Sequence, residues 1–211
     1  MTYNTMVINM LIIAHRGNDG INRENSKEAI VNSLNKEYVN GVEFDIRMTK
    51  DKEFILNHDP FYNNLFIKNT TSKKLKRQGL NTIEEVLDKI NNKKIIMIEV
   101  KDDTKRVKQL AQTLNKILKR YALNLYICSF NYDFIKYFKD TYNYKCGLII
   151  SKHINQNHIV NNFDFNSISY KCMDKITKET FIWTVNNPKY INGDNIITDK
   201  PKLIYDYIKK T

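Results

Sequence analysis

The sequence predicts an α/β protein built as a single (β/α)8 barrel, and two patterns carry this prediction. Short apolar runs of strand length alternate with segments whose apolar residues recur every three and four positions. About eight such repeats follow one another along the 211 residues, which is typical of one TIM barrel. A doubly wound open sheet is the alternative, but AHRGNDG lacks the GxGxxG spacing expected after its first strand.

The elements follow in order from these patterns. The apolar runs predict strands at residues 10–15, 41–46, 94–100, 125–130, 146–151, 166–172, 181–186 and 194–199. The amphipathic segments predict helices at residues 26–38, 81–90, 103–121, 131–140 and 201–210. With three prolines, six glycines and no low-complexity tract, no linker is visible, so we expect one domain over residues 1–211.

Composition limits the class of protein. The 34 basic and 23 acidic residues give a net charge of +11, which suits an anionic partner such as a phosphate ester. The lysines are spread along the chain without interleaved aromatic residues, so nucleic acid is not the expected partner. No apolar run reaches the length of a membrane span, and no basic segment precedes the first one. We expect a cytoplasmic protein with no transmembrane segment.

The cysteines agree with that location. Cys128, Cys146 and Cys172 are odd in number, widely spaced and embedded in apolar sequence. This pattern is typical of reduced core thiols and lacks the spacing of a zinc site.

Chemically active residues gather where the predicted strands end, which is the functional face of a barrel. They are His15, Arg16, Glu43, Asp45, Glu99, Lys101, Ser129 and Trp183. His153 and His158 lie in a polar stretch, where we expect a surface role.

The stretch EFDIRMTKDKEFILNHD predicts a hairpin after the second strand. Glu43 and Asp45 are two positions apart, so they share one face of the strand. If the chain reverses about residues 50–51 through a loop of even length, Glu43 lies opposite His58 and Asp45 lies opposite Leu56. A register slipped by one residue stays open, and it would undo this pairing.

Taken in order, AHRG, ENS, GVEFDIRMTKD, NHD, IEVK, SFN, WTVN and IITDKP resemble the motifs of the glycerophosphodiester phosphodiesterase family, a TIM-barrel group. The resemblance covers nearly the whole chain. It implies a hairpin excursion after strand 2 and an insertion before strand 3, which is short here. The chain departs from the family pattern where Arg23 replaces a proline and Lys52 replaces a turn glycine.

The resemblance also implies roles for single residues. His15 and His58 match the acid-base histidines, and Arg16 and Lys101 match the phosphate-binding cations. The implied metal ligands are Glu43, Asp45 and Glu99, the pocket wall is Trp183, and the supporting pair is Glu24 and Asn25. Asn25 or Ser26 is also suited to cap the helix that follows.

The implied reaction belongs to lipid metabolism: hydrolysis of glycerophosphodiesters to glycerol 3-phosphate and an alcohol. One divalent cation is the expected cofactor, and three carboxylates without thiols favour Mg²⁺ or Ca²⁺ over zinc. Alternatives are a phospholipase related to lysophospholipase D or sphingomyelinase D, and a barrel that binds phosphate esters without catalysis. Apolar residues at positions 61, 62, 65 and 66 favour lipid substrates and leave open a transient contact with a membrane surface.

Overall fold

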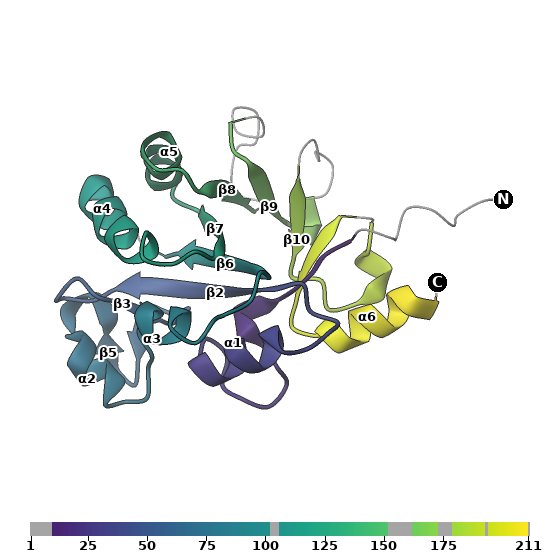
Figure 1. The fold of residues 1–211 in the computed structure, drawn as a ribbon, viewed down its shortest axis with the longest axis horizontal. Helices are drawn as coiled ribbons and strands as arrows, with labels where there is room; N and C mark the ends of the chain where they lie inside the picture. Colours follow the sequence, from purple (N-terminus) through teal and green to yellow (C-terminus); the bar gives the residue numbers. More distant parts are fainter. Residues whose placement is uncertain (1–9, 102–105, 152–161, 173–178, 193, 211) are drawn as a thin grey trace.

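A closed ring of eight parallel strands forms the centre of the computed structural model (Figure 1). The structure describes residues 10–101, 106–151, 162–172, 179–192 and 194–210. The ring closes because β1 pairs in parallel with both β2 and β11. Its strands are β1 (Ile12–Ala14), β2 (Gly41–Met48), β6 (Ile95–Val100), β7 (Asn124–Ser129), β8 (Lys145–Ile150), β9 (Phe165–Ser169), β10 (Thr180–Trp183) and β11 (Asn195–Thr198). The predicted barrel and its strands are confirmed.

The side chains on the two faces of these strands belong to two separate hydrophobic cores. One set of alternate residues fills the inside of the barrel: Ile13, Ile95, Met97, Tyr126, Cys128, Ile149, Phe165, Phe181 and Ile197. The other set, with Val42, Phe44 and Ile98 among its members, packs outward against the helices. Because side chains alternate along a strand, the inward face continues past the interior cluster to the residues at the strand ends. Ile13 is thus followed on its face by His15, and Met97 by Glu99.

Amphipathic helices cover the outside of the ring. They are α1 (Lys27–Leu34), α4 (Val107–Leu118), α5 (Tyr132–Thr141) and α6 (Pro201–Lys210). In α4 the buried residues are Leu110, Ala111, Leu114, Ile117 and Leu118, so one stripe meets the sheet. Ser26 caps α1 by accepting a hydrogen bond from the Ala29 backbone, which decides between the two expected caps. No helix in the described part of the chain is long and apolar enough to cross a membrane.

An excursion leaves the barrel after β2. It comprises β3 (Phe54–Leu56), a two-stranded ribbon of β4 (Phe61–Tyr62) and β5 (Leu65–Phe66), and the short helices α2 (Ser72–Lys76) and α3 (Ile83–Leu87). It has its own small core of Ile55, Ile67, Leu75 and Leu80. Single 3-10 turns lie at His15–Gly17, Ile67–Asn69, Tyr170–Cys172 and Pro188–Tyr190.

The register of the β2–β3 hairpin differs by one residue from the prediction. Leu56 lies opposite Ile46 and not opposite Asp45, so the predicted pairing of Glu43 with His58 is wrong. The reason is the loop, which has three residues and is closed by the Thr49 N–H donating to the Glu53 carbonyl at 2.8 Å. A loop of odd length shifts every pair by one residue relative to an even one.

Lys52 makes that loop length possible. Its φ of 66° is the left-handed conformation that the last residue of a three-residue hairpin loop adopts, and the position is usually a glycine. His58 therefore reaches the barrel mouth by a turn beyond the end of β3, and not by cross-strand pairing.

Candidate active site

Three carboxylates meet at the mouth of the barrel, two of them buried and the third, Glu99, partly buried. Glu43 and Asp45 lie on β2, and Glu99 lies on the neighbouring strand β6, directly across from Asp45. One oxygen from each of the three lies within 4.8 Å of the others. The side chains converge because each points to the inner face of its strand at the carboxyl end.

Packing the acids together changes their protonation. Burial, followed by repulsion from Asp45, raises the pKa of Glu43 from 4.5 to about 8. The same two causes raise the pKa of Glu99 to about 7. Glu43 Oε1 is buried and has no hydrogen-bond partner among the described residues. A site with oxygen ligands, surplus negative charge and an orphaned carboxylate oxygen suits a hard divalent cation.

Two cations flank the acids. Lys101 Nζ lies 2.5 Å from Glu99 and 3.3 Å from Asp45. Arg16 Nε lies 3.6 Å from Asp45, while its backbone N–H donates to Glu43 at 2.9 Å. Burial alone would raise the pKa of Asp45, but Lys101, Asn25 and the neighbouring cations together lower it. Asp45 is therefore the most acidic of the three carboxyl groups, and the Arg16 and Lys101 side chains both lie beside it.

His15 is held by a carboxylate that the sequence alone did not single out. Its Nδ1 lies 2.6 Å from Asp199 Oδ1, and its Nε2 lies 3.9 Å from Glu43. Asn186 in turn donates to the other oxygen of Asp199 at 2.6 Å. Burial would lower the pKa of His15, but the bond to Asp199 and the charge of Glu43 raise it. The sequence signal was Asp199 itself, which directly follows β11 in the ITD sequence but looks like any aspartate at the start of a loop.

His58 lies in a more exposed setting than His15. Its Nδ1 lies 2.7 Å from Asp59, and its carbonyl accepts hydrogen bonds from Arg47. Burial lowers the pKa of His58, and the bond to Asp59 offsets this only in part. Both histidines line one cavity of about 270 Å³, together with Arg16, Glu43, Glu99, Lys101 and Trp183. The structure thus brings the two histidines, the acids and the cations to one place.

The remaining expected residues take separate positions around this cavity. Asn25 is buried, donates to the Asp45 carboxylate at 2.8 Å and accepts from its backbone at 2.9 Å. Glu24 is more exposed and pairs with Arg16 at 2.6 Å. Trp183 forms part of the wall and meets Phe130 edge to face, with ring centroids 5.9 Å apart. His153 and His158 lie outside the described residues.

The cysteines are free thiols. Cys128 is buried at the base of the cavity, and burial raises its pKa well above the ordinary value. Burial likewise raises the pKa of Cys146 to about 12. Neither thiol is suited to act as a nucleophile, because the reactive form is the thiolate.

Comparison with known proteins extends these observations. The model of the glycerophosphoryl diester phosphodiesterase family matches residues 15–204. The glycerophosphodiester phosphodiesterase of Caldanaerobacter subterraneus subsp. tengcongensis is 25% identical over 239 residues, covering 95% of this chain and 98% of that protein.

Solved structures agree on the fold. A glycerophosphodiester phosphodiesterase from Parabacteroides distasonis has a TM-score of 0.82 at 21% identity, over 96% of this chain and 98% of that one. An Oleispira antarctica phosphodiesterase, solved in complex with its product sn-glycerol-3-phosphate, has a TM-score of 0.83 at 18% identity, over 95% and 97% of the two chains. The family match spans most of the sequence and the neighbours share the closed barrel. The chain therefore belongs to the glycerophosphoryl diester phosphodiesterase family and is a phosphodiesterase built on a TIM barrel.

Proposed function

We propose that this protein hydrolyses glycerophosphodiesters to glycerol 3-phosphate and an alcohol, with a divalent cation and a pair of histidines. The observation that carries the proposal is one cavity lined by Glu43, Glu99, two cations and both histidines, with the third acid, Asp45, 3.3 Å from the Lys101 that lines it. Diester hydrolysis needs charge neutralised on the phosphate, a nucleophile deprotonated and a leaving alcohol protonated. Each need has a candidate residue in this cavity.

Glu43, Asp45 and Glu99 are the residues that would hold the cation. The raised pKa of Glu43 and Glu99 and the orphaned oxygen of Glu43 support this assignment. When bound, a hard ion such as Mg²⁺ or Ca²⁺ supplies positive charge to the non-bridging phosphate oxygens. Arg16 and Lys101 bind the same phosphate from the protein side, and Trp183 packs against the glycerol half.

The histidines divide the proton transfers. We assign His15 as the base, because Asp199 holds its Nδ1 and leaves Nε2 facing the cavity. It takes the proton from the glycerol 2-hydroxyl, whose oxygen attacks the phosphorus as the bond to the alcohol breaks. We assign His58 as the acid that protonates the departing alcohol oxygen. Because the pKa of His58 is lowered and that of His15 is raised, the active form is the fraction of molecules in which His58 is protonated and His15 is neutral. The cyclic phosphate is then opened by water as the two histidines exchange roles.

The internal nucleophile is favoured by proximity. The 2-hydroxyl is tethered to the phosphorus, and well-oriented intramolecular attack reaches effective molarities of about 10⁵ to 10⁸ M. A diester made with propanediol in place of glycerol keeps the charge and nearly the size but lacks this hydroxyl. We expect its turnover to fall by orders of magnitude. Equal turnover of the two diesters would mean that water attacks directly.

Phospholipase activity on lysolipids is the second candidate. Phe61 is 56% exposed, which supports contact with acyl chains or a membrane surface. Tyr62 and Leu65 instead pack against the core of the excursion, so the apolar surface is small. The third candidate, phosphate-ester binding without catalysis, predicts that a histidine or carboxylate is missing, and none is.

One assay separates these candidates. Purified protein is incubated with glycerophosphocholine or lysophosphatidylcholine, each with Mg²⁺, Ca²⁺ or chelator. We expect release of glycerol 3-phosphate from glycerophosphocholine with either ion and none with chelator. Faster cleavage of the lysolipid would favour the phospholipase, and no cleavage of either would favour a binding protein. The free thiols suit a reducing compartment, which supports a cytoplasmic location. Residues 1–211 are proposed to form one domain, and the reaction belongs to lipid metabolism.

A further inference from the structure

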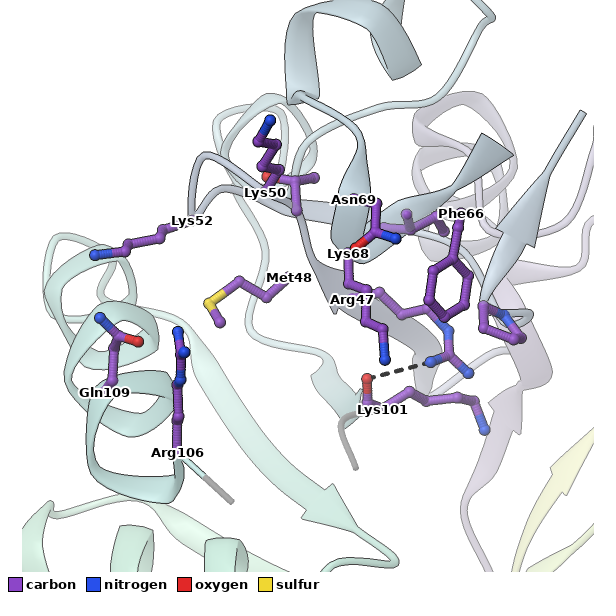
Figure 2. A pocket seen from close by; sticks show the side chains of 13 residues that line it. Arg47, Met48, Lys50, Lys52, Phe66, Lys68, Asn69, Lys101, Arg106 and Gln109 are labelled. Carbon is purple, nitrogen blue, oxygen red and sulfur yellow. Dashed lines mark hydrogen bonds between the residues drawn. The ribbon is translucent and has the colours of Figure 1, made fainter. Parts of the chain in front are cut away.

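A second, larger cavity lies beside the active site (Figure 2). Its volume is about 420 Å³, and it shares Lys101 with the active-site cavity. The described residues that line it include six with basic side chains and none with a carboxylate. The basic residues are Arg47, Lys50, Lys52, Lys68, Lys101 and Arg106. We call this cavity the basic groove.

The basic groove begins directly behind His58. Arg47 follows Glu43 and Asp45 on the same face of β2, one step beyond the acids. Its guanidinium donates to the His58 carbonyl from Nε at 2.9 Å and from Nη2 at 2.7 Å. In Figure 2 it also lies beside the Lys101 backbone, so the two residues form the boundary between the cavities.

Among the described residues, three lysines of the basic groove have no acidic partner. Lys50, Lys52 and Lys68 are exposed, and none of them forms an ion pair within the part of the chain that the structure describes. Lys68 lies over the Phe66 ring, 4.7 Å from its centroid. Other lysines are neutralised: Lys136 pairs with Asp140 at 2.7 Å. A concave surface with uncompensated positive charge concentrates anions.

We infer that the basic groove binds a second anionic group, a phosphate or carboxylate, carried by the alcohol half of the diester. The inference rests on the proposed function, because His58 there protonates the departing alcohol oxygen. The alcohol then leaves on the His58 side, where the groove opens. Met48, Phe66 and Pro60 supply apolar contacts for its carbon chain, and the lysines supply point charges at the far side. The preferred substrates are diesters with an anionic alcohol.

Two matched substrates test this. Glycerophosphoglycerol has an uncharged alcohol, and bis(glycerophospho)glycerol extends the same alcohol by a second phosphodiester. We expect wild-type kcat/KM to be higher for the second, and the ratio to fall with ionic strength. In the Lys50→Gln/Lys68→Gln variant this ratio should drop about five- to thirtyfold, with glycerophosphoglycerol changed less than about twofold. Both lysines are exposed, so the variant should keep its unfolding temperature.

The Lys73→Gln/Lys74→Gln variant is the control. It removes the same net charge from α2, from two exposed lysines that do not line the groove. We expect it to keep the wild-type ratio. An equal loss in both variants would mean a general effect of net charge, and a wild-type ratio near one would mean that the groove takes no anion; either result overturns the inference.

Failure of the proposed function gives a different result. In that case wild type would cleave neither diester. The basic groove can then still be tested by calorimetry, by comparing the affinity of the two diesters for the His15→Ala variant. Tighter binding of bis(glycerophospho)glycerol that the Lys50→Gln/Lys68→Gln change removes would support it, and equal binding of the two diesters would overturn it.

Discussion

Replacing Glu43 by glutamine should stabilise the metal-free protein at alkaline pH while abolishing its activity. Glu43 is 4% exposed, and burial with repulsion from Asp45 raises its pKa from 4.5 to about 8. Between these two pH values the folded chain holds a proton that the unfolded chain has lost. The free energy of unfolding therefore falls as pH rises through this window, and the stability that the protonated acid provides is gone above about pH 8.

The size of the effect follows from the same pKa values. Each tenfold difference in proton affinity is worth about 1.4 kcal/mol, so the loss from this carboxyl between pH 6 and 8.5 is on the order of 2 to 3 kcal/mol. Glutamine has nearly the same shape, and its carbonyl can still accept from the Arg16 backbone N–H, as Glu43 does at 2.9 Å. It cannot ionise. The stability difference between the variant and wild type should therefore grow by that amount over this pH range.

The assay is urea unfolding followed by circular dichroism, with chelator present, at pH 6 and 8.5. Asp45→Asn is the control, because the pKa of Asp45 is lowered and its charge stabilises the fold. That variant should be less stable than wild type at both pH values. Added Mg²⁺ or Ca²⁺ should stabilise wild type and not Glu43→Gln, which should also lose turnover. A stability difference for Glu43→Gln that does not change with pH would refute the reasoning.

Three further outcomes are expected. His15→Ala and His58→Ala should each lower kcat by about 10² to 10⁴, and near-normal kcat in either would remove that histidine from the mechanism. Asp199→Ala should lower kcat by about 10- to 100-fold with little change in KM. It should also move the acid limb of the pH profile of kcat to lower pH, because the pKa of His15 falls without Asp199. An acid limb at the wild-type pH would contradict the role of Asp199 in positioning His15. Gly147→Ala should destabilise the fold by about 1 to 3 kcal/mol in thermal unfolding, since its Cβ would lie 2.3 Å from the Phe165 ring, whereas unchanged stability would mean that the ring moves freely.

The sequence predicted the barrel well because the relevant information is local. Most strands of the ring are apolar runs, and strands such as β2 and β6 are buried on both faces along most of their length, so they can be recognised without knowing the partner strand. The inward position of Glu43, Asp45 and Glu99 follows from alternation alone. Their meeting at one point follows from the parallel direction of the strands.

The hairpin register was beyond the sequence because it depends on loop length. The TKDKE sequence is compatible with a loop of odd or even length. A glycine usually marks the left-handed position of such a loop, but this chain has Lys52 there, so the signal is missing. The register is decided by the backbone hydrogen bond from Thr49 to Glu53, which closes the three-residue loop. The sequence motifs assigned His58 to the site, and His58 does line the active-site cavity. It reaches the cavity through the turn after β3 and not through the predicted cross-strand pairing.

What the sequence determined by itself is the set of elements and the residue types at the strand ends, because periodicity and motifs act over a few residues. Tertiary structure alone decided which distant groups touch. Asp199 follows the last strand and His15 the first, and they lie 2.6 Å apart because β11 and β1 are neighbours in the closed ring. The basic groove likewise gathers lysines from the hairpin and the excursion against α4. Contacts across such separations depend on ring closure and packing, which no local pattern encodes.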